Sequence, residues 1–278
     1  MIRRFQFLIW LAATIGSAFP AVAIDQPRIA SMNVCTDQLL LTLADPEQIV
    51  GLSRYARDRF QSWAADEARR YRILSGGEDI LLIKPDVVVA SLFDKRATRD
   101  LLREKGFGLA EFDVPRSLDD VKAQIRRMGE IVKHPNRVDA EIAKLDAAIA
   151  RARRAVAHSP YRVLPLSRRG WVSGSESLLS SLLAETGLFN AAGELGVGFG
   201  GFASLEDIVK LKPDFLVVSD ASERAEDDGS AFLLHPALQR FYPQSRRIVI
   251  PDRLTVCGGV MLADALDVLV AELRRVQH

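Results

Sequence analysis

"GGEDILLIKPDVVVAS" at residues 76–91 and "SLEDIVKLKPDFLVVS" at residues 204–219 are two copies of one segment. Without a gap they agree at eight of sixteen positions, and they lie 128 residues apart. Each copy predicts a short helix that stops at Lys-Pro-Asp, because proline disfavours helix before it, and then a buried parallel-type strand. The spacing is too long for a solenoid repeat and suits one lobe of a two-lobed protein.

Strand and helix patterns alternate around each copy. Residues 24–116 read in β-α-β-α-β order, which predicts a doubly wound lobe, and the same alternation returns over residues 159–278. Residues 117–158 between them are helical, with a capping pattern at Ser117 and Pro135 placed to open a long helix. We therefore predict an α/β fold in which two doubly wound lobes are joined by a long backbone α-helix, with a ligand cleft between the lobes.

The first residues have the three parts of an export signal. Two arginines supply positive charge, residues 5–19 are mostly apolar, and residues 21–23 have the small-x-small form of a cleavage site. The apolar stretch is too short for a comfortable membrane span. We predict that residues 1–23 are a signal peptide cleaved after Ala23 and that the mature protein works in the periplasm.

Composition and histidine spacing argue against two classes of partner. With a net charge of +1 and no sustained basic run, the chain of 278 residues shows no nucleic-acid footprint. His134, His158, His235 and His278 are not spaced to gather three ligands around a bare metal ion. His235 is expected to cap a helix or lie in a core. No metal site is predicted.

The order of several weak motifs resembles a known family. The start "RIASMNVCTDQLLLTLADPEQIVGLS" at residues 28–53, the two repeated segments and the helical connector are similar to the periplasmic substrate-binding proteins of ABC importers for ferric siderophores and cobalamin. The resemblance covers nearly the whole mature chain. It implies ligand binding between two lobes that hinge only slightly. It also implies a monomer without a cofactor, whose partners are a metal-chelate ligand and the permease and ATPase complex of the inner membrane.

Within that family, the expected cargo is a ferric siderophore, with cobalamin or heme next. The rival hypothesis is an exported α/β enzyme with a cleft-facing Cys35, whose thiol pKa a helix N-terminus would lower. The sequence offers no Gly-x-Ser-x-Gly elbow, no phosphate-binding glycine loop and no base beside Cys35. We therefore expect a binding protein, not an enzyme.

The resemblance gives the repeat a purpose. It implies that Glu78 and Glu206, which occupy matching places in the two copies, are exposed and pair with arginines of the permease. Two matched acids would set the register of the complex through charge-assisted hydrogen bonds. The alternative is that acids at a helix start only complement the helix dipole. That alternative explains either residue alone and suits Asp79 and Asp207, but it does not explain the matched glutamates.

Candidate ligand-binding residues come from loops after the predicted strands, where open α/β sheets bind ligands. Arginines with aromatic side chains suit a bulky, often anionic chelate, because rings pack against its body and guanidinium groups pair with its oxygens. The alternative is that about half of these arginines are simply solvated. The candidates are Arg54, Tyr55, Arg57, Phe93, Arg96, Arg168, Trp171, Phe202 and Arg253, of which Tyr55 and Trp171 are favoured.

Cys35 and Cys257 lie near opposite ends of the mature chain. Three fates are open to them: a disulfide, two free thiols, or soft ligands to the bound species. Export to an oxidising compartment favours the disulfide. A bridge would require their Cα atoms to lie within about 7 Å of each other.

Overall fold

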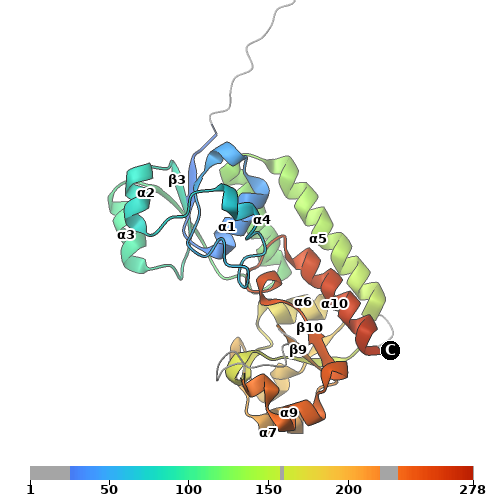
Figure 1. The fold of residues 1–278 in the computed structure, drawn as a ribbon. Coiled ribbons are helices and arrows are strands. Elements are labelled where there is room, and N and C mark those ends of the chain that lie inside the picture. Colours follow the sequence, from blue (N-terminus) through green and yellow to red (C-terminus); the bar gives the residue numbers. More distant parts are fainter. Residues whose placement is uncertain (1–25, 157–159, 220–230, 278) are drawn as a thin grey trace, which may run out of the picture.

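The computed structural model describes residues 26–156, 160–219 and 231–277, which form two α/β lobes and so confirm the predicted fold class (Figure 1). The predicted signal peptide lies outside the described residues. The first lobe holds a parallel sheet with the strand order β2-β1-β3-β4. Its strands are β1 (Ile29–Ser31), β2 (Ile49–Gly51), β3 (Val87–Ser91) and β4 (Gly108–Phe112).

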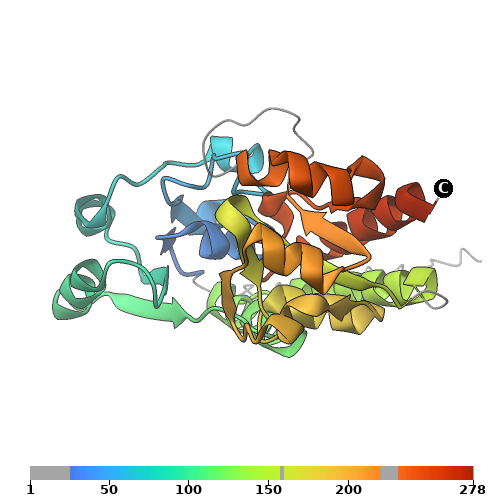
Figure 2. The same ribbon diagram turned by 90° about the horizontal axis from the view of Figure 1, so that it is seen from below.

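Helices cover both faces of this sheet, as the alternation of side chains along a strand requires. Ala30 and Val88 face a small core shared with α2 (Gly77–Ile83) and α3 (Arg96–Glu104). The neighbouring Ile29 and Val89 point the other way, into the main core with α1 (Val34–Leu43). Figure 2 shows α2 and α3 set apart from the rest of the molecule on one side of the sheet.

The second lobe repeats the parallel sheet with the strand order β10-β9-β5-β7. The lobe also has a separate antiparallel pair, β6 with β8. This pair was not predicted, because both segments are expected from the sequence to be loops. The strands are β5 (Arg162–Pro165), β6 (Trp171–Ser173), β7 (Phe189–Asn190), β8 (Gly200–Phe202), β9 (Phe215–Val218) and β10 (Arg247–Val249). The helices of this lobe are α6 (Leu178–Thr186), α7 (Leu205–Leu211), α9 (Pro236–Phe241) and α10 (Leu262–Gln277).

Two helices connect the sheets: α4 (Leu118–Val132) and the long α5 (Pro135–Val156). In Figure 1, α5 runs along one edge of the molecule from the first lobe to the second, beside α10. One continuous core joins Ile29 of the first sheet, Leu145 and Ala152 of α5, and Val163 and Ile248 of the second sheet. Both lobes are therefore packed onto a common helical spine.

The Lys-Pro-Asp frame of the repeat has the same structural role in both lobes. In the first copy, α2 ends at Lys84 in the left-handed region (φ 49°), and the carboxylate of Asp86 accepts a hydrogen bond from Arg28 N at 2.7 Å. The Arg28 guanidinium in turn donates to the carbonyl oxygens of Ile83 and Lys84. The frame thus fastens a helix end to the start of the neighbouring central strand.

The second copy repeats these contacts atom for atom. Helix α7 ends at Lys212 (φ 50°), and Asp214 accepts a hydrogen bond from Arg162 N at 2.8 Å. Arg162 donates to the carbonyl oxygens of Leu211 and Lys212. The repeated Lys, Pro and Asp are explained by folding alone. No helix in the described ranges is both long enough and apolar enough to cross a membrane.

Candidate ligand cleft and docking faces

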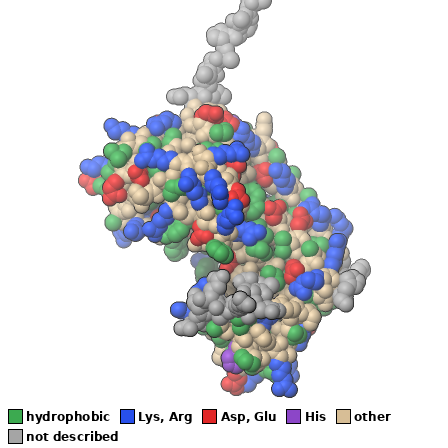
Figure 3. Space-filling model, in the orientation of Figure 1, with side chains coloured by type: hydrophobic (Ala, Val, Ile, Leu, Met, Phe, Trp, Pro, Cys, Tyr) green, Lys and Arg blue, Asp and Glu red, His purple; other side chains and the backbone are tan. Residues whose placement is uncertain are grey.

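A cleft of about 580 Å³ lies between the lobes and is walled by both. The first lobe contributes Phe60, Gln61, Val114 and Pro115, and the second contributes side chains around the ends of β5, β6 and β9. Several large apolar side chains in these walls are open to water: Phe60 is 79% exposed and Phe199 is 51% exposed. Figure 3 shows the molecule narrowing between its lobes, with hydrophobic side chains at the junction. Apolar surface of this kind marks a binding site.

A tight turn places Trp171 in the cleft wall. The turn between β5 and β6 puts Arg169 and Gly170 at positive φ (57° and 79°), and a Cβ on Gly170 would lie 2.5 Å from the Ala203 carbonyl oxygen. Strand β6 then pairs Trp171 with Phe202 of the antiparallel strand β8, with their rings edge-to-face at 5.1 Å. Cross-strand aromatic pairs of this kind stabilise a short antiparallel pair, so the indole is held in one place.

The polar part of the lining is mostly uncharged. Arg168 and Asp252 are its only charged side chains among the described residues, and both have interaction partners. Hydroxyl groups and one amide supply the other polar side chains. They are Gln61, Ser167, Ser173, Ser177, Ser219 and Thr255.

The structure divides the predicted ligand-binding residues into three groups. Arg168 and Trp171 line the cleft, and Phe202 packs against Trp171 outside the lining. Arg54, Tyr55 and Phe93 line a different hollow in the first lobe. Arg57, Arg96 and Arg253 line neither of these cavities.

Two of the outlying arginines have partners in the fold. The Arg57 guanidinium donates to the carbonyl oxygens of Ala68, Arg69 and Tyr71, which closes the loop before β3. Arg96 pairs with Asp100 one helical turn away. Their contacts are those of structural side chains, which residue type alone does not distinguish from ligand-binding ones.

Sequence reasoning missed most of the apolar wall. Phe60, Phe199 and Val256 all belong to loops that were considered, but arginines and other rings in those loops were preferred. Val114 and Pro115, which follow β4, were not among the loop residues proposed from the sequence. A useful signal was present, since Val256 directly precedes Cys257, and the favoured disulfide to Cys35 would bring this segment to the junction of the lobes.

The first-lobe hollow has a volume of about 440 Å³ and shares no lining residue with the cleft. Its lining includes Arg54, Tyr55, Glu78 and Phe93. The Arg54 guanidinium lies 4.7 Å from the centre of the Tyr55 ring and donates to its hydroxyl oxygen at 2.5 Å. This cation–π pair orients the phenol at the rim of the hollow.

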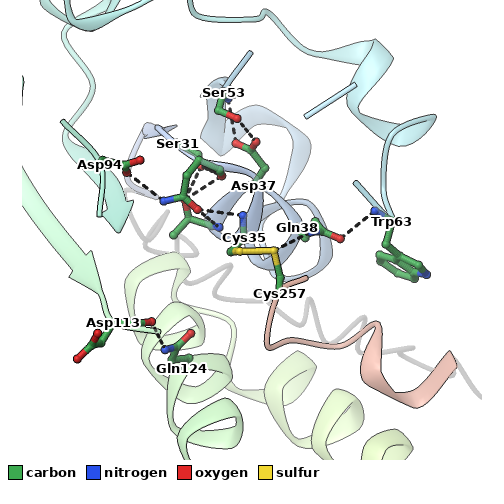
Figure 4. The surroundings of a disulfide bond; sticks show 12 residues. Ser31, Cys35, Asp37, Gln38, Ser53, Trp63, Asp94, Asp113, Gln124 and Cys257 are labelled. Atoms are coloured by element: carbon green, nitrogen blue, oxygen red, sulfur yellow. Dashed lines mark hydrogen bonds between the residues drawn. A yellow bond between two sulfur atoms is a disulfide. The ribbon is translucent and has the colours of Figure 1, made fainter. Parts of the chain in front are cut away.

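A buried acid holds the start of the loop that carries Tyr55 and Phe60. Asp37, fully buried in α1, accepts hydrogen bonds from Ser53 N at 3.0 Å and Ser53 Oγ at 2.6 Å (Figure 4). Ser53 Oγ also accepts one from Tyr55 N. Burial raises the pKa of Asp37 to about 6, although the Ser53 hydrogen bonds act in the opposite direction.

Cys35 and Cys257 form a disulfide between α1 and the segment before α10, with their Cα atoms 5.3 Å apart. Gln38 Nε2 donates to the sulfur of Cys257, and Gln38 Oε1 accepts from Trp63 N (Figure 4). Trp63 Nε1 then donates to Asp264 of α10 at 2.7 Å. The bridge and this chain of hydrogen bonds join the first lobe to α10. A disulfide sulfur is not a thiolate, so Cys35 in this state is not the nucleophile that the enzyme hypothesis requires.

Glu78 and Glu206 are both exposed, one in each lobe, near the starts of α2 and α7. The Glu78 carboxylate has no hydrogen-bond or ion-pair partner among the described residues, whereas Glu206 pairs with Lys210 at 2.7 Å. Their neighbours Asp79 and Asp207 instead accept hydrogen bonds from Ser75 and Ser204 at the helix starts. The aspartates therefore accept hydrogen bonds at the helix starts, whereas neither glutamate accepts one there.

The histidines serve the fold where they are described. His235 Nδ1 accepts a hydrogen bond from Ala237 N at the start of α9, and His134 pairs with Asp45. No group of three metal-ligating side chains occurs within residues 26–156, 160–219 and 231–277.

Comparison with known proteins gives one family and several solved structures. A family model described as periplasmic binding protein matches residues 29–254, whereas no curated protein matches the chain by sequence. The periplasmic heme-binding protein RhuT from Roseiflexus sp. RS-1, in its apo form, superposes with a TM-score of 0.74 at 26% identity, covering 91% of this chain and 100% of that chain.

Two further structures are similar in fold. The periplasmic heme-binding protein BhuT in complex with two hemes gives a TM-score of 0.72 at 21% identity, covering 91% of this chain and 99% of that chain. A periplasmic heme-binding protein from Pseudomonas aeruginosa gives 0.72 at 19% identity, covering 88% and 92%. The family match takes in both repeated segments and most of the residues that line the cleft, and it confirms the resemblance noted in the sequence. The chain belongs to the periplasmic binding protein family.

Proposed function

We propose that the chain is the exported solute-binding component of an ABC importer, that its signal peptide is cleaved after Ala23, and that it captures a metal chelate between its lobes. One observation carries the proposal: exposed apolar side chains from both lobes, Phe60 on one side and Phe199 and Trp171 on the other, face a single cleft. Membership of the periplasmic binding protein family and the heme-binding proteins of similar fold support it.

The lining favours a chelate whose metal is already saturated by its own ligands. None of the described residues that line the cleft is Tyr, His, Met or Cys, which are the usual axial donors to heme iron. Residues 220–230, which follow Ser219 of the lining in the chain, contain none of these types either. A ferric siderophore needs no protein donor, and the apolar walls suit its organic body. We therefore rank a ferric siderophore first and cobalamin second.

Heme is the alternative cargo, and a specific observation favours it. RhuT, at 26% identity, is named as a heme-binding protein. Tyr55 is the one tyrosine found in the described lining of either the cleft or the first-lobe hollow. If heme is the cargo, the Tyr55 phenolate is the donor that we expect to bind its iron.

Titration of the mature protein distinguishes these cargoes. Cleavage after Ala23 leaves Trp63 and Trp171, so a Trp63→Phe variant reports on the cleft alone. The probes are ferric catecholate, hydroxamate and carboxylate siderophores, cyanocobalamin and hemin. We expect one ferric siderophore class to quench Trp171 fluorescence and to be recovered chemically unchanged. Hemin that binds with a Soret shift lost in Tyr55→Phe would favour the alternative, and no binding by any probe would refute the proposal.

Matched variants locate the binding site. Phe199→Ala and Phe60→Ala remove exposed rings from opposite walls of the cleft, and each is expected to weaken binding about tenfold or more. Phe241→Ala is the control, because Phe241 is an exposed ring of α9 that lies outside the lining. Equal affinities for all three variants would place the site elsewhere.

A further inference from the structure

The two docking glutamates stand on helices that present different faces to a partner. One helical turn after Glu78, α2 has Leu82, which is 77% exposed; at the matching position α7 has Lys210. Lys210 Nζ lies 2.7 Å from a carboxylate oxygen of Glu206. The second-lobe acid is thus already paired by its own helix, whereas the first-lobe acid stands beside an uncovered apolar side chain.

The first-lobe hollow adjoins Glu78 at the start of α2. Gly76 and Gly77 line the first-lobe hollow, where the second copy has Ser204 and Leu205. In the second lobe, the Leu205 side chain packs against the core. In the first lobe, side chains of the chain itself lie over the two glycines, since a Cβ on Gly76 would lie 2.9 Å from Glu78 Oε2 and one on Gly77 would lie 3.0 Å from Thr98 Cγ2. The hollow beside them has a volume of about 440 Å³.

The same hollow is rimmed by apolar side chains that the fold does not use. Phe93 is 78% exposed, and Leu101 of α3 is also open to water. The acid Asp94 in this lining is occupied, since it accepts hydrogen bonds from Asn33 Nδ2 and Ser91 N. Glu78 is then the one acid among the described lining residues that has no partner in the chain. The lining also holds Lys95 and Arg54, of which Arg54 donates to the Tyr55 hydroxyl. An unpaired carboxylate near the exposed Phe93 and Leu101 is complementary to a cation followed by a large apolar side chain.

We propose that the permease docks unequally on the two lobes: a large apolar side chain of the permease enters the first-lobe hollow beside an arginine or lysine paired with Glu78, and the second lobe makes a charge contact only. The proposal rests on the proposed function, because it takes the permease as the partner. Exposed charge pairs contribute little free energy, and the Glu206 carboxylate must also exchange Lys210 for its new partner. The first lobe therefore carries most of the docking affinity.

Exchange of the residues at the matching positions 82 and 210 tests this. Right-side-out inner-membrane vesicles from the native cells are titrated with mature protein loaded with the iron-55 chelate that binds it most tightly. We expect Leu82→Lys and Phe93→Ser each to raise the protein concentration for half-maximal uptake about tenfold. Lys210→Leu is the matched control on the second lobe, and we expect it to change that concentration less than threefold.

The chelate affinity of each purified variant distinguishes impaired docking from impaired chelate binding. Unchanged affinity with impaired uptake supports the proposal. Equal effects of Leu82→Lys and Lys210→Leu would overturn the asymmetry, and a loss of chelate affinity in Phe93→Ser would assign the hollow to the cargo. Normal uptake by a Glu78→Gln, Glu206→Gln double variant would instead refute the docking function itself.

Discussion

The two copies of the repeated segment share the contacts that end the helix, and they differ in the exposed residue one turn after the matched glutamate. In both, an aspartate and an arginine fasten the end of the helix to the central strand: Asp86 with Arg28, and Asp214 with Arg162. At one exposed position, Leu82 of the first copy replaces Lys210 of the second. Repetition along this chain therefore marks a shared folding unit, and departures from it point to contacts that only one lobe makes.

The largest expected effect comes from removing the disulfide that links the first lobe to the segment before α10. The Cys35–Cys257 disulfide closes a sequence separation of 222 residues. In the chain-entropy model, its loss costs about 5 kcal/mol of unfolding free energy. We expect the Cys35→Ser, Cys257→Ser double variant to lose stability on that scale in urea unfolding under oxidising conditions.

Reduction of the wild-type protein is the control, because it should bring its urea midpoint to that of the double variant. An oxidised wild type no more stable than the variant would mean that the lobes are held by the core along α5 and α10 without help from the bridge.

A second difference between the lobes is the buried acid of the first. Because the folded-state pKa of Asp37 is raised from 3.8 to about 6, its stabilising contribution is present below about pH 4 and is lost as pH rises through 6. At pH 7.5 the buried charge costs up to about 3 kcal/mol. We expect Asp37→Asn to gain stability relative to wild type as pH rises from 4 to 7.5.

The difference in unfolding free energy between wild type and Asp37→Asn separates the contribution of Asp37 from those of the other acids. The Arg137 hydrogen bond lowers the pKa of Asp45 to about 2, so the contribution of Asp45 to stability changes with pH in the opposite direction. Asp45 is present in both proteins. A wild-type-minus-variant difference that is flat across this pH range, measured by urea unfolding, would contradict the prediction.

The starts of the two repeated helices should differ in how much they contribute to the unfolding free energy, by a smaller amount than the effects above. Ser204 Oγ accepts a hydrogen bond from Asp207 N, and Ser204 N donates to the Asp207 carboxylate, which completes a capping box in α7. In α2 the matching residue is Gly76, and Asp79 still accepts from the backbone N–H of Ser75. Ser204→Ala should lower the unfolding free energy by about 1 kcal/mol, and Ser75→Ala should lower it less. Equal losses would show that the two starts are equivalent.

The smallest effect on stability is expected at Leu82 of α2 and at the matching Lys210 of α7. Glu206 is 75% exposed in its pair with Lys210, and such pairs contribute no more than about 0.5 kcal/mol. Lys210→Ala and Leu82→Ala should therefore leave the thermal midpoint nearly unchanged. A large loss from either would mean that the residue is retained for folding, and the docking interpretation of this position would fail.

The repeat was enough to predict two lobes, because helix stops and buried strands depend on local sequence. The antiparallel β6–β8 pair was not predicted, because its strands are three residues each and the Trp171–Phe202 pair forms only when distant segments meet. The cleft wall was only partly predicted for the same reason. Nothing local separates Arg57, which binds backbone carbonyl groups, from Arg168, which lines the cleft.

The most direct test asks whether capture and delivery belong to separate surfaces. A Glu78→Gln, Glu206→Gln double variant is compared with wild type for chelate affinity in solution and for uptake in vesicles. The control is a Glu47→Gln, Glu130→Gln variant, which makes the same charge change at two exposed sites outside α2 and α7. We predict unchanged affinity and loss of uptake in the first variant alone. Uptake at the wild-type level, or a parallel loss of affinity, would contradict the assignment of these glutamates to docking.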